Sequence, residues 1–529
     1  MRYHASVPTY HVENFGCRAT QADGAALESQ FESRGLRQAP AAQANLVILN
    51  TCSVTNSADQ DARAAIRRVQ RQNPGAKIIV TGCYAQRAPQ EIAVLPGVTA
   101  VIGNSHKHRL AEIALDNIVV TRRDDDEREQ TQRSFFPLSA LTENRELTTE
   151  NRIFVSDIFA HTELLAAPVF EGNSHESDRT RPNLKVQDGC DNRCSFCIIP
   201  SVRGQSRSLN LPEIVRQVNS LVAAGYREVV ISGINLGRWG RDLAVSPQLS
   251  ALSKNRRPDF EDLLRIILRE TTLEKLRISS VEPMDWSDEL IALVAGSPRI
   301  ARHAHVPLQS GSDAVLRRMH RKYRPWHYRE KIEKIHAAMP TAAIGADVMT
   351  GFPGETDAEF EATRSLVADL PFTYLHVFTY SARPGTPAAA MLNQVPAQVA
   401  RERNKILRDL AAEKKLAFTK SFVGKSLAAI TLGAAHSGPD GEFTEALTDN
   451  YQKLYLRGRH EANHWITAHI EGVADGALVG ASLSGSKPAA QIWSGSSGSG
   501  SRTGASGFSG GFGGSLMGGG EGSAGERRP

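Results

Sequence analysis

The amino-acid sequence predicts an α/β protein of three domains: a doubly wound parallel sheet, a partial (β/α)6 barrel and a small β-barrel, followed by a disordered Gly/Ser-rich tail. The length of 529 residues is too great for one hydrophobic core. Over residues 1–112 and about 183–418, apolar runs alternate with amphipathic stretches, as in parallel sheets covered by helices. Short β-type runs separated by glycines then indicate the small barrel. The expected boundaries are 1–112, 181–420 and 421–485 for the three domains and 486–529 for the tail.

Two segments lie outside these domains. Residues 113–180 show no regular pattern and include a charge run at 122–128, so we interpret them as an extended linker. The tail cannot bury enough apolar surface to fold.

The composition indicates the cellular compartment and the kinds of partner that the protein can have. The formal net charge of +5 and the isoelectric point near 8.8 permit nucleic-acid binding without requiring it. The sequence contains no run of about 18 apolar residues and no signal-peptide pattern, so we expect a cytoplasmic protein without a membrane segment. Six cysteines in a reducing compartment favour metal binding or catalysis over disulfides.

In the first domain, a cysteine closely follows each of three expected strands. Because the carboxyl ends of parallel strands meet at one edge of a sheet, Cys17, Cys52 and Cys83 would share one crevice. The alternative is three independent buried cysteines. A helix expected over residues 58–72 has a basic face that is either a solvated surface or a contact for RNA phosphates. The three strands are expected over residues 9–12, 44–50 and 76–81.

A second group of three cysteines opens the second domain. Cys190, Cys194 and Cys197 are separated by gaps of three and two residues. Three thiolates this close can hold a four-iron cluster and leave one iron without a protein ligand. Zinc is less favoured, because no cysteine follows Cys197 and no histidine close after it could be the fourth ligand.

The sequence pattern of the second domain predicts six strand–helix units. Chemistry is expected at the carboxyl ends of barrel strands, and the second cysteine group follows the first of them. The strands are expected over residues 184–187, 228–232, 275–280, 303–308, 344–349 and 374–380, with helices such as 211–224, 325–339 and 357–370.

Together, the cysteine motifs resemble those of the radical S-adenosylmethionine (SAM) methylthiotransferases. The resemblance covers roughly residues 8–112 and 180–485 and uses all six cysteines. It implies an auxiliary 4Fe-4S cluster on the first cysteine group, a second, SAM-binding 4Fe-4S cluster on the other, and SAM as cosubstrate. The motifs are Gly16-Cys17-Arg18, Asn50-Thr51-Cys52-Ser53-Val54-Thr55, Thr81-Gly82-Cys83-Tyr84-Ala85-Gln86 and the stretch from Gly189 to Cys197, with Phe196 before its last cysteine.

The same resemblance implies residues that would contact the cofactor. They are Phe196 in the cysteine motif, Gly233 in a loop resembling the one that receives the SAM amino group, Glu282 and Ser310. The glycine-rich loops equally suit tight turns. Glu282 would hold a ribose hydroxyl or form a salt bridge with an arginine, and both alternatives stay open.

Candidate substrate contacts are basic. Arg203 and Arg383 are expected near the barrel mouth, where each would neutralise a substrate phosphate or carboxylate or else stabilise a loop. The third domain resembles the RNA-binding TRAM domain of the family, and Lys453 and Arg457 lie where basic and aromatic residues interleave. Lys453 and Arg457 are therefore expected to contact tRNA. His303 and His305, which alternate on one strand of the second domain, are interpreted as structural histidines.

The resemblance implies a radical reaction that replaces an unactivated C–H bond by C–S–CH3. The expected substrate is N6-threonylcarbamoyladenosine at position 37 of the tRNA anticodon loop, methylthiolated at C2. Alternatives are N6-isopentenyladenosine-37, an aspartate of ribosomal protein uS12, another radical SAM reaction, or a disfavoured iron–sulfur electron carrier. Expected partners are tRNA, a reductant such as a flavodoxin or ferredoxin, and an unknown sulfur donor, with the protein itself a monomer. The stretches closest to the threonylcarbamoyladenosine branch are residues 81–86, 234–243, 279–283 and 376–381.

Overall fold

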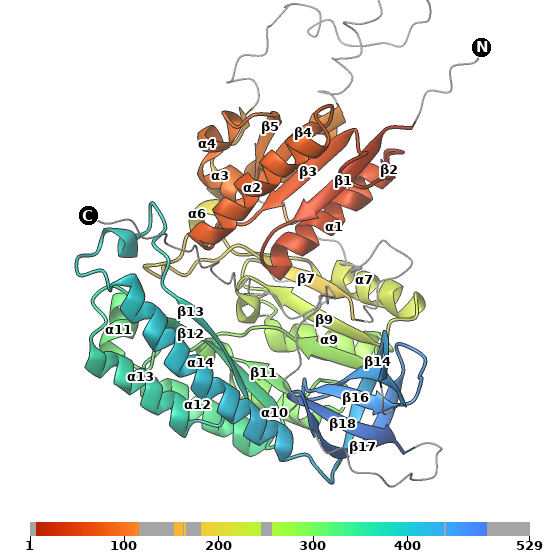
Figure 1. Ribbon diagram of the computed structural model, residues 1–529, viewed down its shortest axis with the longest axis vertical. Helices are drawn as coiled ribbons and strands as arrows, with labels where there is room; N and C mark the ends of the chain where they lie inside the picture. The colour runs from red at the N-terminus through yellow and green to blue at the C-terminus, as the bar shows by residue number, and fades with distance from the viewer. Residues whose placement is uncertain are drawn as a thin grey trace, which may run out of the picture.

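The computed structural model describes residues 7–115, 153–161, 163–165, 181–244, 256–438 and 441–483. In Figure 1 the N-terminal domain lies above the central barrel, and the C-terminal barrel lies beside the lower part of the central barrel. Most of the expected linker and all of the expected tail lie outside the described residues.

The N-terminal domain is built on a parallel sheet with the strand order β2-β1-β3-β4-β5-β6. Helices cover both of its faces. One core packs α1 (Arg18–Glu32) against one face, and another packs α2 (Asn56–Gln72) against the other. This confirms the doubly wound prediction and places a reversal of strand order between β1 and β3. The strands are β1 Thr9–Asn14, β2 Arg37–Gln38, β3 Leu46–Thr51, β4 Lys77–Gly82, β5 Val98–Gly103 and β6 Ile153–Phe154.

One short strand comes from the expected linker. β6 pairs in parallel with β5 at the edge of this sheet, although residues 113–180 were expected to carry no regular structure. Ser156 fixes the segment, because its N–H donates to Ser105 Oγ at 3.0 Å. The linker prediction is therefore wrong for these residues, since a two-residue strand has too short a pattern to be recognised.

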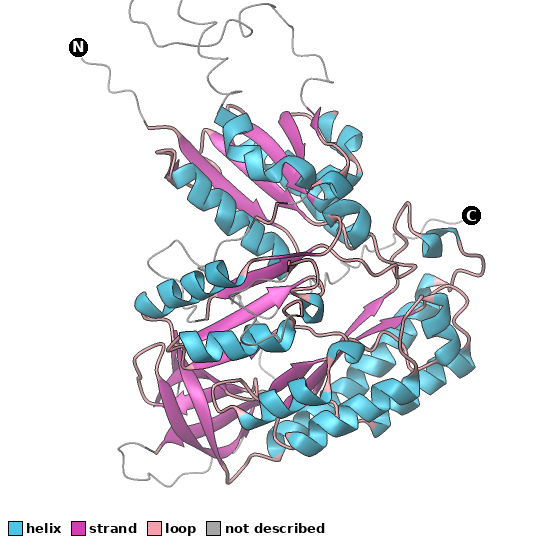
Figure 2. Ribbon diagram, turned by 180° about the vertical axis from the view of Figure 1, so that it is seen from behind, coloured by secondary structure: helices cyan, strands magenta, loops and turns pink. Residues whose placement is uncertain are grey.

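The central domain is an open barrel of six parallel strands. Two sheets, β7-β9-β10 and β11-β12-β13, are joined by a parallel bridge between Ser280 and His305. The helices lie outside the curved sheet, as Figure 2 shows, and α14 (Ala397–Lys420) packs against β13. This confirms the partial barrel. The strands are β7 Asn183–Asp188, β9 Glu228–Gly233, β10 Lys275–Ile278, β11 His303–His305, β12 Ala343–Thr350 and β13 Tyr374–Thr379, with a short antiparallel β8 Arg207–Ser208 beside β7.

The outer helices carry clear local signals. α13 begins with a capping box, in which Thr356 and Glu359 bond each other's backbone N–H groups. α7 begins at an asparagine cap with a proline inside its first turn. The helices are α6 Ile199–Arg203, α7 Leu211–Ala223, α9 Phe260–Glu270, α10 Asp288–Gly296, α11 Asp313–Arg318, α12 Pro325–Ala338 and α13 Asp357–Asp369.

The C-terminal domain is a closed five-stranded barrel. All neighbouring strands are antiparallel except β16 and β18, which run parallel. Three of the strands, β14, β16 and β17, coincide with the short β-type runs of the sequence at residues 426–432, 451–456 and 465–470, and β15 and β18 complete the closure. The strands are β14 Ser426–Gly438, β15 Gly441–Thr448, β16 Lys453–Arg457, β17 Trp465–Ala474 and β18 Ala477–Ser482.

This small barrel packs against the amino ends of the central strands. Arg277 in β10 donates to the carbonyl oxygen of Asp449 at 3.2 Å and lies over the Tyr451 ring at 5.4 Å. Asn450 donates to the carbonyl oxygen of Thr341, just before β12, at 2.9 Å. The opposite, carboxyl ends of the strands are left for the cysteine motifs.

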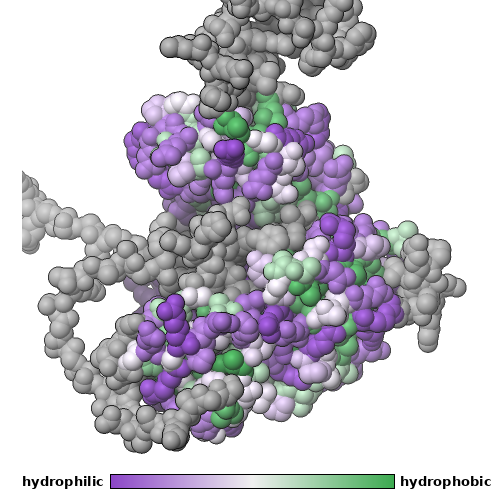
Figure 3. Space-filling model, turned by 90° about the vertical axis from the view of Figure 1, so that its right-hand side faces the viewer, coloured by the Kyte–Doolittle hydropathy of each residue, from purple (hydrophilic) through white to green (hydrophobic). Residues whose placement is uncertain are grey.

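The surface is mainly polar. The face in Figure 3 carries mostly hydrophilic residues, with small separated hydrophobic areas. None of the helices in the described part of the chain combines the length and apolar character needed to cross a membrane.

Candidate functional site

The structure brings the first cysteine group to one edge of the N-terminal sheet. Cys17 precedes α1, Cys52 directly follows β3, and Cys83 begins the short helix α3 (Cys83–Arg87) after β4. Because β1, β3 and β4 are parallel neighbours, these positions share the carboxyl edge beside the reversal of strand order. The thiols are close enough that Cys17 and Cys83 both act electrostatically on Cys52.

Burial disfavours the thiolate form of these cysteines. Cys52 is 4% and Cys83 1% exposed. Burial, followed by the neighbouring thiols of Cys17 and Cys83, raises the pKa of Cys52 to about 12. Thiolates here need compensating positive charge, which a bound metal group supplies.

Polar groups from two domains close this site. Asn104 Nδ2 lies 3.7 Å from Cys83 Sγ and donates to the carbonyl oxygen of Val202 at 2.7 Å. The Lys107 ammonium, which pairs with Asp23 at 2.9 Å, and the Arg203 guanidinium both act to lower the pKa of Cys83, against the larger raising effect of burial. Three thiols in a cationic, largely buried setting fit an iron–sulfur cluster as donor set.

The second cysteine group occupies the loop after β7, the first barrel strand. Its sulfurs receive hydrogen bonds from outside the loop. Arg321 Nη1 donates to Cys194 Sγ at 3.3 Å, and Asn235 Nδ2 donates to Cys190 Sγ at 3.6 Å. Burial raises the pKa of Cys197 to about 12. These three thiols also fit an iron–sulfur cluster as ligands. The sequence analysis had assigned no role to the side chains of Arg321 and Asn235.

Three of the expected SAM-contacting residues lie at the carboxyl edge of the barrel beside this loop. Gly233 ends β9, and a Cβ there would lie 2.8 Å from Gln187 Oε1, so the backbone approaches β7 closely. Phe196 packs edge to face with Phe352, with ring centroids 6.4 Å apart. The Glu282 carboxylate pairs with the Arg321 guanidinium, which supports the salt-bridge alternative.

Ser310, the fourth of them, is fully buried. Its hydroxyl lies 3.1 Å from Thr363 Oγ1 in α13 and accepts from the Ser312 N–H. The structure therefore gives Ser310 a role in holding the loop after β11.

Arg203 and Arg383 do not face an open mouth, so the expected substrate contact is corrected. Arg203 is 2% exposed and donates to Asp188 at 3.0 Å and to Asp23 at 3.1 Å. Arg383 is 1% exposed and pairs with the Asp59 carboxylate. Both guanidinium groups join the barrel to the N-terminal domain, because Asp23 and Asp59 belong to that domain.

Lys453 and Arg457 lie half exposed on β16. Lys453 pairs with Glu445 at 2.7 Å and lies over the Tyr455 ring at 4.7 Å. Arg457 pairs with Glu471 at 2.8 Å. A tRNA phosphate would have to compete with these carboxylates.

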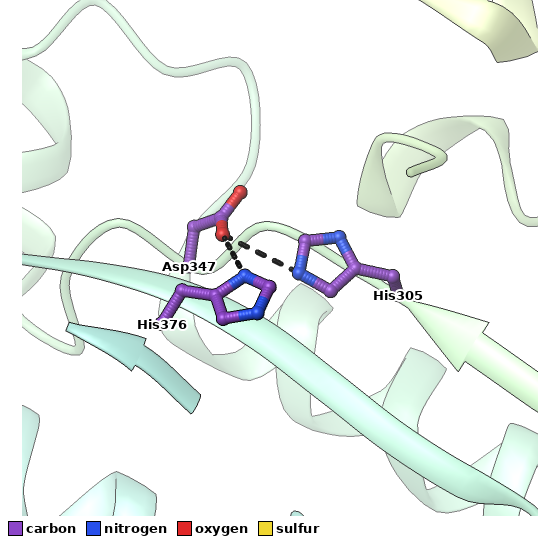
Figure 4. Close-up of side chains that lie close together, drawn as sticks. All are labelled: His305, Asp347 and His376. Carbon is purple, nitrogen blue, oxygen red and sulfur yellow. Dashed lines mark hydrogen bonds and ion pairs between the residues drawn. The ribbon is translucent and has the colours of Figure 1, made fainter. Parts of the chain in front are cut away.

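A further polar group lies on the inner face of the barrel (Figure 4). His305, Asp347 and His376 come from the neighbouring strands β11, β12 and β13. Asp347 Oδ1 is 3.3 Å from His305 Nε2 and 3.1 Å from His376 Nδ1. Burial acts to raise the pKa of Asp347, but His305 and His376 hold it well below its usual range. His303, as expected, is a buried structural histidine that bonds the Tyr374 hydroxyl at 2.7 Å.

Two protein-family models match this chain. Residues 184–367 match the radical SAM superfamily, and residues 9–103 match an uncharacterized protein family named UPF0004. The model resembles the radical SAM methyltransferase TsrM from Kitasatospora setae, with a TM-score of 0.50 and 14% identity over 72% of this chain and 77% of that one. This likeness concerns the fold.

Comparison with curated proteins is more specific. The chain is 34% identical to the threonylcarbamoyladenosine tRNA methylthiotransferase MtaB of Bacillus subtilis, over 86% of this chain and 91% of the relative. It is 36% identical to MtaB of Rickettsia prowazekii, over 79% and 86%. It is 33% identical to the tRNA-2-methylthio-N(6)-dimethylallyladenosine synthase of Novosphingobium aromaticivorans, over 80% and 86%. The chain therefore belongs to the methylthiotransferase family of radical SAM enzymes.

Proposed function

We propose that the protein adds a methylthio group to C2 of N6-threonylcarbamoyladenosine at position 37 of tRNA, using SAM and two 4Fe-4S clusters. The observation that carries the proposal is the pair of three-thiol groups on adjoining domains of a chain that matches MtaB relatives along most of its length. Cys17, Cys52 and Cys83 would hold one cluster, and Cys190, Cys194 and Cys197 the other.

The contact between the domains supports a shared reaction site. Cys83 packs in one apolar cluster with Ile198 and Val202, which directly follow the second cysteine group. Helix α6 thus touches the first thiol group and leads back to the second. A substrate held between the domains would lie beside both groups.

The clusters would bring chemistry that side chains cannot perform. When bound, they supply the electron that cleaves SAM to a 5′-deoxyadenosyl radical and the iron that carries the sulfur to be transferred. The chain's own residues hold and shield these groups. Arg321 and Asn235 hydrogen-bond to ligand sulfurs, and Arg203 and Lys107 place positive charge near the buried thiols.

The C-terminal barrel would hold the tRNA backbone. Lys453 and Arg457 lie on one strand beside Tyr455 and Phe443, which suits contact with phosphates and stacking of bases. A reductant such as a flavodoxin or ferredoxin and a sulfur donor complete the set of partners, with catalysis in the cytoplasm.

The second candidate substrate is N6-isopentenyladenosine-37, because one of the similar relatives is named as a synthase of its methylthio derivative. An isopentenyl group requires an apolar pocket. The polar inner face with His305, Asp347 and His376 favours the threonylcarbamoyl substrate instead.

Mass spectrometry of tRNA nucleosides tests the proposal. The chain, or its Cys194→Ala variant, is expressed in a host that lacks methylthio modification. We expect 2-methylthio-N6-threonylcarbamoyladenosine only with the intact chain. Appearance of the isopentenyl product alone would make the substrate assignment wrong, and absence of both with loaded clusters would direct attention to uS12.

A further inference from the structure

The group of His305, Asp347 and His376, which we term the polar triad, has no part in holding either cysteine group. The triad lies on three adjacent parallel strands, where Asp347 and His376 pair in register and His305 pairs with Gly345, two residues before Asp347 on β12. The three side chains point toward one another (Figure 4). Their ligating atoms lie within 4.8 Å of one another. A few convergent polar groups on a concave, mostly apolar surface are typical of ligand sites.

The triad is positioned by its surroundings. The Ser280 hydroxyl hydrogen-bonds to His305 Nδ1, so the orientation of that ring is fixed. The Tyr374 ring lies against His305, with centroids 6.0 Å apart and planes 19° apart. A Cβ on Gly345 would meet that tyrosine ring at 2.0 Å, so only glycine lets the ring lie flat on β12. These contacts therefore hold the His305 ring of the triad in place before any ligand binds.

Two imidazole nitrogens of the triad remain able to hydrogen-bond to a ligand. His305 is 8% exposed, and its Nε2 lies 3.3 Å from Asp347 Oδ1, an ion-pair contact; within the described part of the chain this nitrogen makes no hydrogen bond. His376 is 48% exposed and uses Nδ1 for Asp347, so its Nε2 faces away from the carboxylate. A buried nitrogen that makes no hydrogen bond is costly unless a ligand supplies one.

The position links the triad to the radical site. Ser280 lies two residues before Glu282, whose carboxylate pairs with Arg321, and Arg321 donates to Cys194 Sγ. One loop thus connects the triad with a sulfur of the second cysteine group. A nucleoside reacting at that site would extend its substituents along the inner face.

We propose that the polar triad is the subsite for the ureido and carboxylate groups that threonylcarbamoylation adds to the adenine; this rests on the proposed function. The Asp347 carboxylate accepts ureido N–H groups, and His305 and His376, as imidazolium rings with an N–H on each nitrogen, donate to the carbonyl and carboxylate oxygens. An isopentenyl group would leave all of these unpaired. Sites built to hydrogen-bond a substrate reject analogues that lack the partner by factors of roughly ten thousand.

The test compares His376→Phe and the isosteric Asp347→Asn with the wild type on two tRNAs, one bearing threonylcarbamoyladenosine and one isopentenyladenosine. His336→Phe, at an exposed histidine on the outer helix α12, is the matched control. Each protein is also measured for iron content and for 5′-deoxyadenosine formed without tRNA. These two readouts detect general damage to the fold or to the clusters.

We expect His376→Phe and Asp347→Asn to lose at least about tenfold in kcat/KM on the threonylcarbamoyl substrate, with iron content and tRNA-independent SAM cleavage unchanged. The His336→Phe control keeps wild-type rates. Wild-type rates for His376→Phe would overturn the subsite while leaving the proposed function intact. Stoichiometric zinc or manganese that is lost in the variant would overturn it in favour of a metal site. A wild type active only on the isopentenyl tRNA would overturn both proposals.

Discussion

At the scale of single residues, the site consists of thiols whose properties are set by burial and by a few polar neighbours. Cys52 and Cys83 are buried with a raised pKa, and Arg321 hydrogen-bonds to Cys194. Buried neutral thiols become metal ligands only by losing protons. We therefore expect these residues to affect both the stability of the metal-free chain and the properties of a bound cluster.

The raised pKa of Cys52 predicts a pH effect on the metal-free protein. Between about pH 9 and 12 the folded chain keeps a proton that the unfolded chain releases, so stability is full below this window and falls as pH rises through it. Urea denaturation under reducing conditions at pH 7.5 and about 9.5 measures it. Cys52→Ala should show a smaller loss than the wild type, and an equal loss in both would contradict the prediction.

Arg321→Leu should lower the reduction potential of the SAM-binding cluster. A hydrogen bond to a charged group contributes about 1.5 kcal/mol, which corresponds to roughly 60 mV for a one-electron couple. An EPR-monitored redox titration gives the shift, with Arg321→Lys as the charge-preserving control. A potential equal to that of the wild type would show that the contact at Cys194 has no electrostatic role.

At the scale of elements, strand ends place the thiols. Gly82 ends β4 with φ +99°, and a Cβ there would lie 2.2 Å from the carbonyl oxygen of Thr51 on β3. The next residue is Cys83. The strand pairing and the position of this thiol therefore depend on the absence of a side chain.

Gly82→Ala is expected to destabilise the N-terminal domain by about 1 kcal/mol for the left-handed backbone and about 2 kcal/mol more for the clash. Gly225, with φ +92° and, apart from its chain neighbours, no described atom within 4 Å of its Cβ position, is the matched control. Gly225→Ala should show only the first cost in thermal unfolding. Equal shifts for the two variants would remove the close approach as the cause.

The elements recognised from the sequence were those with strong local patterns. Buried apolar runs revealed β3 and β4, and cysteines at their ends indicated a shared edge because parallel strands all point the same way. β15 and β18 were missed, since their alternation is diluted by glycine and alanine. The pairing of Arg203 with Asp23 and of Arg383 with Asp59 could not be predicted from the sequence, because only the packing of the two domains brings these groups together.

At the scale of the whole molecule, buried charges join the N-terminal domain to the barrel. Asp23 from α1 pairs with Lys185 of β7 and with Arg203 after the second cysteine group. Arg383 reaches Asp59 and donates to Ser53 Oγ at 2.8 Å. These contacts fix the two thiol groups relative to each other.

Arg383→Met should weaken this coupling. We expect a loss of at least about 2 kcal/mol, because Asp59 keeps Arg87 as a partner at 3.0 Å but loses a buried cation. Calorimetry should resolve separate unfolding of the N-terminal domain. Lys405→Met, at an exposed pair with Asp409, is the control and should change stability by less than about 0.5 kcal/mol.

The most direct test of two cooperating thiol groups is an in vitro reaction with threonylcarbamoyladenosine tRNA, in which methylthio product and 5′-deoxyadenosine are quantified together. Cys52→Ser should still form 5′-deoxyadenosine but no methylthio product, whereas Cys194→Ala should form neither. Full methylthio product from Cys52→Ser would show that the N-terminal thiols are not needed. The protein would then be a radical SAM enzyme working from one cluster alone.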